Sequence, residues 1–172
     1  MNEPLSFETL YAQHAARVYR LALRLTGNRE EAEDLAAESL AEAFRTWGGY
    51  RGESAPETWL HGIVLNRWRM IRRKRKVPTD PLRTAETVAT TFRSQDLELA
   101  EALGALPTAL REAFLLVKGE GFTHSEAASV LKIPVGTVYF RVHVAIRKLR
   151  VALGPIPGRI PTAIEVTFEQ EL

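Results

Sequence analysis

Basic side chains are concentrated in two segments of this chain, and such segments are suited to binding a polyanion. Residues 67–76 read RWRMIRRKRK, with seven basic residues and no acidic one. A second stretch, residues 127–164, contains no Asp or Glu. Each Lys or Arg that neutralises a phosphate releases counterions and adds affinity without sequence preference. The basic residues of the second stretch are Lys132, Arg141, Arg147, Lys148, Arg150 and Arg159.

Acidic side chains gather in residues 30–42, which hold six acidic residues and no basic one. The net charge of the chain is +2, and subtracting the seven charges of residues 67–76 leaves −5 for the rest. This segregation predicts two kinds of partner, a polyanion for the basic surfaces and a basic protein surface for the acidic one. The alternative for the acidic run is a solvated helix face.

Catalytic and metal-binding patterns are not found in the sequence. The chain has no cysteine, and His14, His61, His124 and His143 form no metal-binding spacing with a carboxylate cluster. No nucleophile–base–acid arrangement or glycine-rich phosphate loop is present. We therefore expect neither an enzyme nor a cofactor. No run of about 18 apolar residues and no signal-peptide pattern occurs, so we expect a cytoplasmic protein without membrane insertion.

Helical periodicity extends over most of the 172 residues and positions these charged segments. Apolar residues at three-four spacing predict a helix over 6–25, and Asn28 with Glu31 resembles a capping box for the next helix, which carries the acidic run. Gly48, Gly49 and Gly52 mark a loop that holds Tyr50 and Arg51. Ser54 with Glu57 predicts the cap of a third helix, which ends in the basic run.

Two residues of this third helix have more than one interpretation. Asn66 is able to pair with a base edge, and Tyr50 or Arg51 to stack on an unstacked base, whereas local bonding and partial burial are the alternatives. Trp68 lies on the same helix face as Val64 and Ile71, a spacing that favours a core position over a stacking surface. For the basic run itself, a membrane surface or a solvated helix end are the alternatives to nucleic acid.

A helix-turn-helix pattern follows in the C-terminal third. Residues 77–95 lose periodicity and read as a flexible linker, and helical spacing returns at 96–103 and after Pro107. Residues 123–131 predict a first helix, 132–134 a turn and 135–153 a cationic second helix, the usual arrangement for a major groove. A plain helical hairpin is the alternative. The outward residues of the second helix are Thr137, Tyr139, Phe140, Arg141, His143, Val144 and Arg147.

Five motifs, in their order and spacing over about residues 6–153, resemble bacterial RNA polymerase sigma factors of the extracytoplasmic-function (ECF) group of the sigma-70 family. The motifs are EDLAAESL at 33–40, YRGES at 50–54, TWLHGIVLN at 58–66, LP with LREAFL at 106–115, and PVGTV at 134–138. The resemblance implies an all-α fold of two small helical domains joined by a flexible linker. It places a core polymerase and −10 domain at 1–76, the linker at 77–95, and a −35 helix-turn-helix domain at 96–153. The tail at 154–172 lies outside the match and is of unknown role, although 164–168 alternate like a short strand.

By the same resemblance, the partners are core RNA polymerase (the β′ clamp and the β flap), promoter DNA, and an anti-sigma factor or other protein regulator. The residues implied for core polymerase binding are Asp34, Leu35, Glu38 and Glu42. Those implied for the −10 element are Tyr50, Arg51, Asn66, Arg67, Arg69, Arg72 and Arg73. The outward residues of the second helix would read the −35 element.

Departures from the family pattern concern the −35 surface. Tyr139 and Phe140 follow Gly-Thr-Val where relatives often have a basic residue and Ser, Val144 stands where a basic residue is common, and Lys132 replaces a common turn glycine. The aromatic pair would contact either thymine methyl groups or a protein. Two other functions remain open, namely a sigma-like decoy that sequesters an anti-sigma factor and a stand-alone helix-turn-helix regulator.

Overall fold

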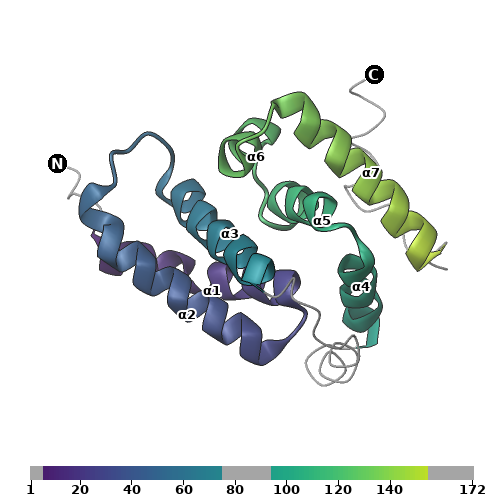
Figure 1. Cartoon of the computed structure of the whole chain (residues 1–172), viewed down its shortest axis with the longest axis horizontal. Helices are drawn as coiled ribbons and strands as arrows, with labels where there is room; N and C mark the ends of the chain where they lie inside the picture. The colour runs from purple at the N-terminus through teal and green to yellow at the C-terminus, as the bar shows by residue number, and fades with distance from the viewer. Residues whose placement is uncertain (1–5, 75–93, 155–172) are drawn as a thin grey trace.

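Residues 6–74 and 94–154 are described by a computed structural model, and all their regular elements are helices (Figure 1). This confirms the all-α fold expected from sequence. The N-terminal helices are α1 (Phe7–Thr26), α2 (Arg29–Thr46), the single turn η1 (Trp47–Gly49) and α3 (Pro56–Lys74). The C-terminal ones are α4 (Ser94–Ala105), α5 (Thr108–Phe114), the π-helical turn η4 (Leu115–Gly119), α6 (His124–Leu131) and α7 (Val135–Leu153). Most of the expected linker and nearly all of the tail, including 164–168, lie outside the described residues.

Helix ends follow the capping residues of the sequence, with one exception. The Asn28 side chain accepts a hydrogen bond from the backbone N–H of Glu31 at 3.0 Å, and Thr123 with Glu126 forms a reciprocal capping box before α6. The expected third helix is present as α3, but the Ser54–Glu57 capping box expected for it was wrong, because this helix begins at Pro56 and the Glu57 carboxylate pairs with Arg17 of α1 at 3.0 Å.

The turn of the helix-turn-helix is built on a left-handed residue. Lys132 has φ 56° and ψ 48°, and its backbone N–H donates to the carbonyl of Ala128. For a residue with a Cβ this conformation costs about 1–2 kcal/mol relative to the right-handed one. The turn bends α6 against α7 by 103°. Val138 and Val142 on the inner face of α7 are buried and hold this helix on the C-terminal core.

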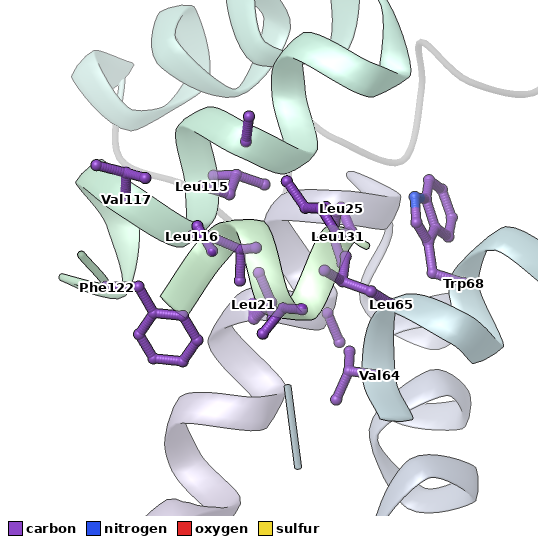
Figure 2. Close-up of a cluster of buried hydrophobic side chains, with 14 of the residues drawn as sticks. Leu21, Leu25, Val64, Leu65, Trp68, Leu115, Leu116, Val117, Phe122 and Leu131 are labelled. Atoms are coloured by element: carbon purple, nitrogen blue, oxygen red, sulfur yellow. The ribbon is translucent and has the colours of Figure 1, made fainter. Parts of the chain in front are cut away.

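One hydrophobic core joins the N-terminal and C-terminal helices, whereas the sequence led us to expect two small cores. Figure 2 shows Leu25 of α1 and Leu65 of α3 close to Leu131 of α6, with Leu116 beside Leu21. Figure 1 accordingly shows α3 facing α5 and α6. Trp68 is buried at the edge of this cluster, which confirms its expected core position.

None of the helices in the described part of the chain is by itself long and apolar enough to cross a membrane. The pair α6 and α7 meets the length and composition requirement only when taken together across its bend.

Candidate nucleic-acid interface

A hollow of about 300 Å³ lies where the glycine loop meets the start of α3. Tyr50 is fixed in its wall, because its ring stacks on Trp47 with centroids 5.1 Å apart and its hydroxyl donates to the carbonyl of Ser54. Arg51 is exposed at the rim. The lining is therefore aromatic with a cation at its edge, which suits a planar base. The lining residues are Gly49, Tyr50, Arg51, Glu53, Ser54 and Trp59.

One exposed face of α3 leads from this hollow toward the basic end of the helix. Asn66 lies two helical turns after Trp59, so the two residues share a face about 10 Å apart along the axis. Asn66, Met70 and Arg73 on that face are all exposed. Asn66 is not part of the hollow's lining, so the structure brings Tyr50 and Arg51 together but places Asn66 further along.

The side chains of the basic run point in three directions, because the run is part of a helix. Arg67 points to α2, where its guanidinium donates to the Glu38 carboxylate at 2.6 Å. Arg69 points to α5 and pairs with Glu112, while Arg73 is exposed. Arg72 donates to the Thr108 hydroxyl on the same side and lies over the Trp68 ring. Arg67, Arg69 and Arg72 are therefore engaged within the chain, which the sequence pattern did not reveal.

The acidic surface of α2 is formed by Asp34 and Glu38, both of which are exposed. Glu42 is half-buried and paired with Arg45. Leu35, which was expected to contact a partner, is instead 0% exposed and belongs to the core. Asp34, directly before it, faces outward while Leu35 itself is buried, because successive helical residues turn by about 100°.

The outward face of α7 combines cations with aromatic rings. Phe140 is 66% exposed and Tyr139 is 49% exposed, and the Tyr139 ring stacks on His124 of α6 with centroids 3.7 Å apart. His143 and Arg147 are exposed on the same helix. The other three expected residues, Thr137, Arg141 and Val144, are partly buried.

Two buried carboxylates at the contact between the two halves were missed by sequence reasoning. Glu112 is 3% exposed and Glu120 is 8% exposed. Helical spacing offers a signal for Glu112, which lies one turn before the buried Leu115 and Leu116. For Glu120, which precedes a loop glycine, the sequence holds no such signal.

Glu120 is surrounded by basic side chains of the N-terminal half. Its carboxylate lies 3.3 Å from a guanidinium nitrogen of Arg24, and 3.6 Å from both Arg17 Nε and His61 Nε2. Arg17 also donates to the backbone carbonyl of Glu120 at 2.8 Å. Burial raises the pKa of Glu120, but His61, Arg24 and Arg17 together outweigh burial and hold this pKa below its usual value.

His14 lies at the edge of the same network. Its Nδ1 is 3.7 Å from the carboxylate of Glu57. Burial lowers the pKa of His14, and the charge of Arg17 and the nearby His61 lower it as well, while the attraction of Glu57 opposes them. The net lowering favours a neutral imidazole in the folded chain.

Comparisons with known proteins give consistent relatives for both halves. A profile of Sigma-70 region 2 matches residues 10–77, and one of Sigma-70, region 4 matches residues 96–149. The ECF RNA polymerase sigma factor SigM of Mycobacterium tuberculosis is 31% identical over 164 residues, covering 94% of this chain and 82% of SigM. SigE of Mycolicibacterium smegmatis, also an ECF RNA polymerase sigma factor, is 34% identical over 158 residues. That match covers 84% of this chain but only 60% of SigE, so the chain spans less than two thirds of that relative.

Solved structures share the fold. The sigma factor RpoE of Bartonella quintana, in complex with the anti-sigma factor NepR, matches with a TM-score of 0.73 at 24% identity. This match covers 86% of this chain and 96% of RpoE. CnrH, in complex with the cytosolic domain of CnrY, matches with a TM-score of 0.67 at 26% identity over 86% of each chain.

Proposed function

This chain belongs to the ECF group of the sigma-70 family, the sigma factors of bacterial transcription initiation, and we propose that it binds core RNA polymerase and directs it to promoters. The hollow beside Trp59 and the exposed face of α3 that continues from it carry the proposal. In this role the chain acts by binding rather than by catalysis, in the cytoplasm where the polymerase works. The N-terminal domain serves the −10 element and the C-terminal domain the −35 element.

Strand opening at the −10 element is assigned to the hollow and to α3. Flipping a base out of the stack costs a few kcal/mol, so a pocket and a cationic backbone track must offset that cost. Tyr50 and Arg51 line the hollow, Asn66 offers an amide to a base edge, and Arg73 lies further along the same helix face. Arg67, Arg69 and Arg72 can bind the DNA backbone only when their contacts with Glu38, Glu112 and Thr108 are broken.

Polymerase binding is assigned to the acidic surface of α2, formed by Asp34 and Glu38 with Glu42 at its end. Exposed carboxylates on one helix suit a basic coiled coil such as that of the β′ clamp, because complementary charge steers association and fixes register. Leu35 is not part of the proposed polymerase contact, because it is buried. The C-terminal domain would approach the β flap.

Promoter recognition at the −35 element is assigned to α7. Its outward face has no acidic residue, and its cations bind phosphates while Phe140 lies among them. The thymine methyl group in the major groove is an apolar contact for such a side chain. The −35 contacts are therefore Phe140, with Tyr139, Thr137, Arg141, His143, Val144 and Arg147 around it.

A protein regulator is a further proposed partner. RpoE and CnrH were solved with the anti-sigma factor NepR and with the cytosolic domain of CnrY, respectively. The anti-sigma factor class is accordingly the partner that we propose for this chain. A decoy function has a specific observation in its favour, because the anti-anti-sigma factor PhyR of Bartonella quintana shares the fold with a TM-score of 0.61 at 16% identity. The basic track of α3 favours the sigma factor, since a decoy has no need of DNA contacts.

Transcription in vitro tests the proposal directly. Core polymerase, the full chain and a pool of genomic promoter fragments are combined, and start sites are mapped. Discrete transcripts that depend on the chain would support a sigma factor and reveal both promoter elements. Polymerase binding without transcripts would contradict independent promoter opening. No polymerase binding would overturn the proposal in favour of the decoy or the stand-alone regulator.

A further inference from the structure

A pair of stacked rings joins the two helices of the helix-turn-helix at the surface of the motif. The imidazole of His124 and the phenol of Tyr139 are parallel to within 8°, and their centroids are 3.7 Å apart. His124 belongs to α6 and is half-buried, while Tyr139 belongs to α7 and is 49% exposed. One face of the Tyr139 ring is therefore covered by the neighbouring helix, although the residue lies on the proposed −35 surface.

The backbone of the motif fixes the position of the His124 ring. His124 is the first residue of α6 and follows the capping box directly. In this box the Thr123 hydroxyl accepts from the backbone N–H of Glu126 at 3.2 Å, and the Glu126 carboxylate accepts from the backbone N–H of Thr123 at 2.8 Å. The left-handed Lys132 then forms the turn across which α6 and α7 meet at 103°. The Tyr139 ring is thus ordered before any DNA arrives.

The direction of the stack separates Tyr139 from Phe140. In a helix-turn-helix the second helix enters the major groove, whereas the first helix crosses the sugar-phosphate backbone. A ring that lies on the first residue of α6 is therefore held toward the backbone side of the motif, where contacts position a protein without reading sequence. Phe140 is turned from Tyr139 by about 100° around α7 and is 66% exposed.

Attachment of α7 to the core does not depend on this stack. Val138 and Val142 hold the helix from its inner face, where they are almost fully buried. Both stacked rings keep exposed surface instead. The main effect of the stack is accordingly on where the Tyr139 side chain lies, and a side chain without such a neighbour exchanges among its rotamers.

We infer that His124 is a positioning residue for −35 recognition, because it holds the Tyr139 ring on α6 and leaves base reading to Phe140. This role rests on the proposed assignment of α7 to the −35 element and adds a residue of α6 to it. Once the stack is lost, the Tyr139 ring reaches into the groove beside Phe140. A phenol hydroxyl both donates and accepts hydrogen bonds, so it tolerates several bases and makes the preference at the neighbouring base pairs less strict.

His124→Ala and His124→Phe in the full chain test the role of stacking, since Phe keeps a flat ring and Ala removes it. Ser125→Ala is the matched control, because Ser125 is the next residue of α6 and is exposed. The probe is a pool of duplexes of about 20 base pairs, roughly two helical turns, with a randomised centre. Binding is carried out at low salt, where the affinity for DNA is highest, and the bound duplexes are sequenced.

The measured quantity is the ratio between the best and the worst base at each position of the selected sequence. In His124→Ala this ratio should fall at least about fivefold at one or two adjacent positions, the lower end of the usual cost of one mismatched base pair. His124→Phe and Ser125→Ala should keep the preference of the unsubstituted chain. Circular dichroism verifies that each variant keeps its helical content.

The stack itself is measured without DNA. Fluorotyrosine labels the four tyrosines of the chain, and Tyr139→Phe identifies the fluorine NMR signal of residue 139. This signal should shift in His124→Ala, because the ring that shields it is gone, and should shift less in His124→Phe. An unchanged signal in His124→Ala would overturn the inference, since the stack would then not hold Tyr139 in solution.

Two results with the duplex pool would also overturn the inference. If the unsubstituted chain and His124→Ala select the same sequences with the same ratios, the position of Tyr139 does not affect base reading. If His124→Phe loses the preference as fully as His124→Ala, the imidazole acts by itself rather than through stacking. A chain that selects no sequence at all would contradict the −35 assignment of α7 together with the inference, so the two failures are distinguishable.

Discussion

Tyr50 occupies a fixed position before any base arrives, since its ring stacks on Trp47 and its hydroxyl is bonded to the Ser54 carbonyl. A side chain ordered in advance loses little entropy on binding, which favours capture of an unstacked base. Arg51 and Asn66 differ from Tyr50 in being exposed. In the proposed base capture, Tyr50 therefore contributes a rigid ring in the hollow, while Arg51 and Asn66 contribute polar groups that face solvent.

Asn66→Ala should impair promoter opening roughly tenfold while changing the affinity for core polymerase less than about twofold. The expected loss corresponds to one lost amide–base contact, about 1–3 kcal/mol. Opening is measured by permanganate reactivity of unpaired thymines, and polymerase affinity by fluorescence anisotropy. Gln13→Ala is the control, because Gln13 is an exposed amide on α1. Equal losses in opening and in polymerase affinity would contradict the role of Asn66 in base capture.

Phe140→Ala should weaken binding to a −35 duplex about fivefold, in keeping with the loss of an apolar contact to one thymine methyl group. Replacing −35 thymines by uracil removes only those methyl groups. This replacement should weaken binding of the unsubstituted chain and leave Phe140→Ala unaffected, as measured by anisotropy.

Val151→Ala serves as the control for Phe140, since Val151 is an exposed apolar residue in the last turn of α7. If uracil substitution weakens DNA binding of the unsubstituted chain and of Phe140→Ala equally, Phe140 would be assigned to a protein contact instead. Tyr139 is already stacked on His124, so its ring is less available than that of Phe140.

At the scale of the element, α3 shows why a basic run in sequence is not a single basic surface. Residues three or four apart share a helix face, whereas adjacent residues do not. The face toward α5 carries Arg69 and Arg72, the face toward α2 carries Arg67, and the solvent-exposed face carries Asn66 and Arg73. One helix therefore contributes to the core, to an ion-paired interface and to the proposed DNA surface.

The acidic surface of α2 gives a prediction at the same scale. Asp34→Lys with Glu38→Lys should weaken binding to core polymerase at least about tenfold, because a basic partner then meets like charge at a cost of several kcal/mol. Affinity is measured by anisotropy at several salt concentrations, and the salt dependence should decrease in the variant.

Glu98→Lys with Glu101→Lys is the control for the acidic surface. It makes the same change in net charge on α4, where both residues are exposed. Unchanged polymerase affinity in the Asp34 and Glu38 variant would identify the acidic run as a solvated helix face.

At the scale of the whole molecule, the shared core makes the two halves interdependent. Leu21 and Val64 of the N-terminal half belong to the same buried cluster as Leu115 and Leu131 of the C-terminal half. Separation of the halves exposes apolar surface, which costs a free energy of about 25 cal/mol for each Å² exposed. A partner that covers this surface, such as polymerase or a regulator, would therefore stabilise the separated arrangement.

Acid should destabilise the folded chain in two pH windows. The folded pKa of His14 is lowered from 6.5, so the unfolded chain binds this proton first and stability falls as pH drops below 6.5. The folded pKa of Glu120 is lowered from 4.5, so its contribution is present above 4.5 and is lost as pH falls through the folded pKa. Urea unfolding at about pH 7, 5.5 and 4 measures both effects.

Single substitutions separate the two windows. His14→Gln should remove the loss just below pH 6.5, and Glu120→Gln should lower stability at neutral pH while flattening the dependence below pH 4.5. An unchanged pH profile in either variant would mean that other groups account for that window. The groups around His14 are Glu57, Arg17 and His61, and those around Glu120 are Arg17, Arg24 and His61.

Features that depend on local order along the chain were predictable from the amino-acid sequence. Helical periodicity predicted the all-α fold, Asn28 predicted the start of the second helix, and motif order predicted the sigma family. Local spacing likewise placed Trp68 in the core. The predictions from capping and periodicity succeeded because they involve residues within about one or two helical turns of each other. Motif order was readable because it lies along the chain itself.

Which charged groups meet could be learned only from the fold. Arg69 and Glu112 are 43 residues apart in the chain, and Arg17 and Glu120 are 103 apart. Leu35 was misassigned for a related reason, because its burial depends on how α2 packs against α1 and α3. Charge pairing and burial are set by the distances between elements, which composition and periodicity leave open. The sequence therefore reveals that the chain carries basic and acidic segments, while the fold determines which of them remain available to a partner.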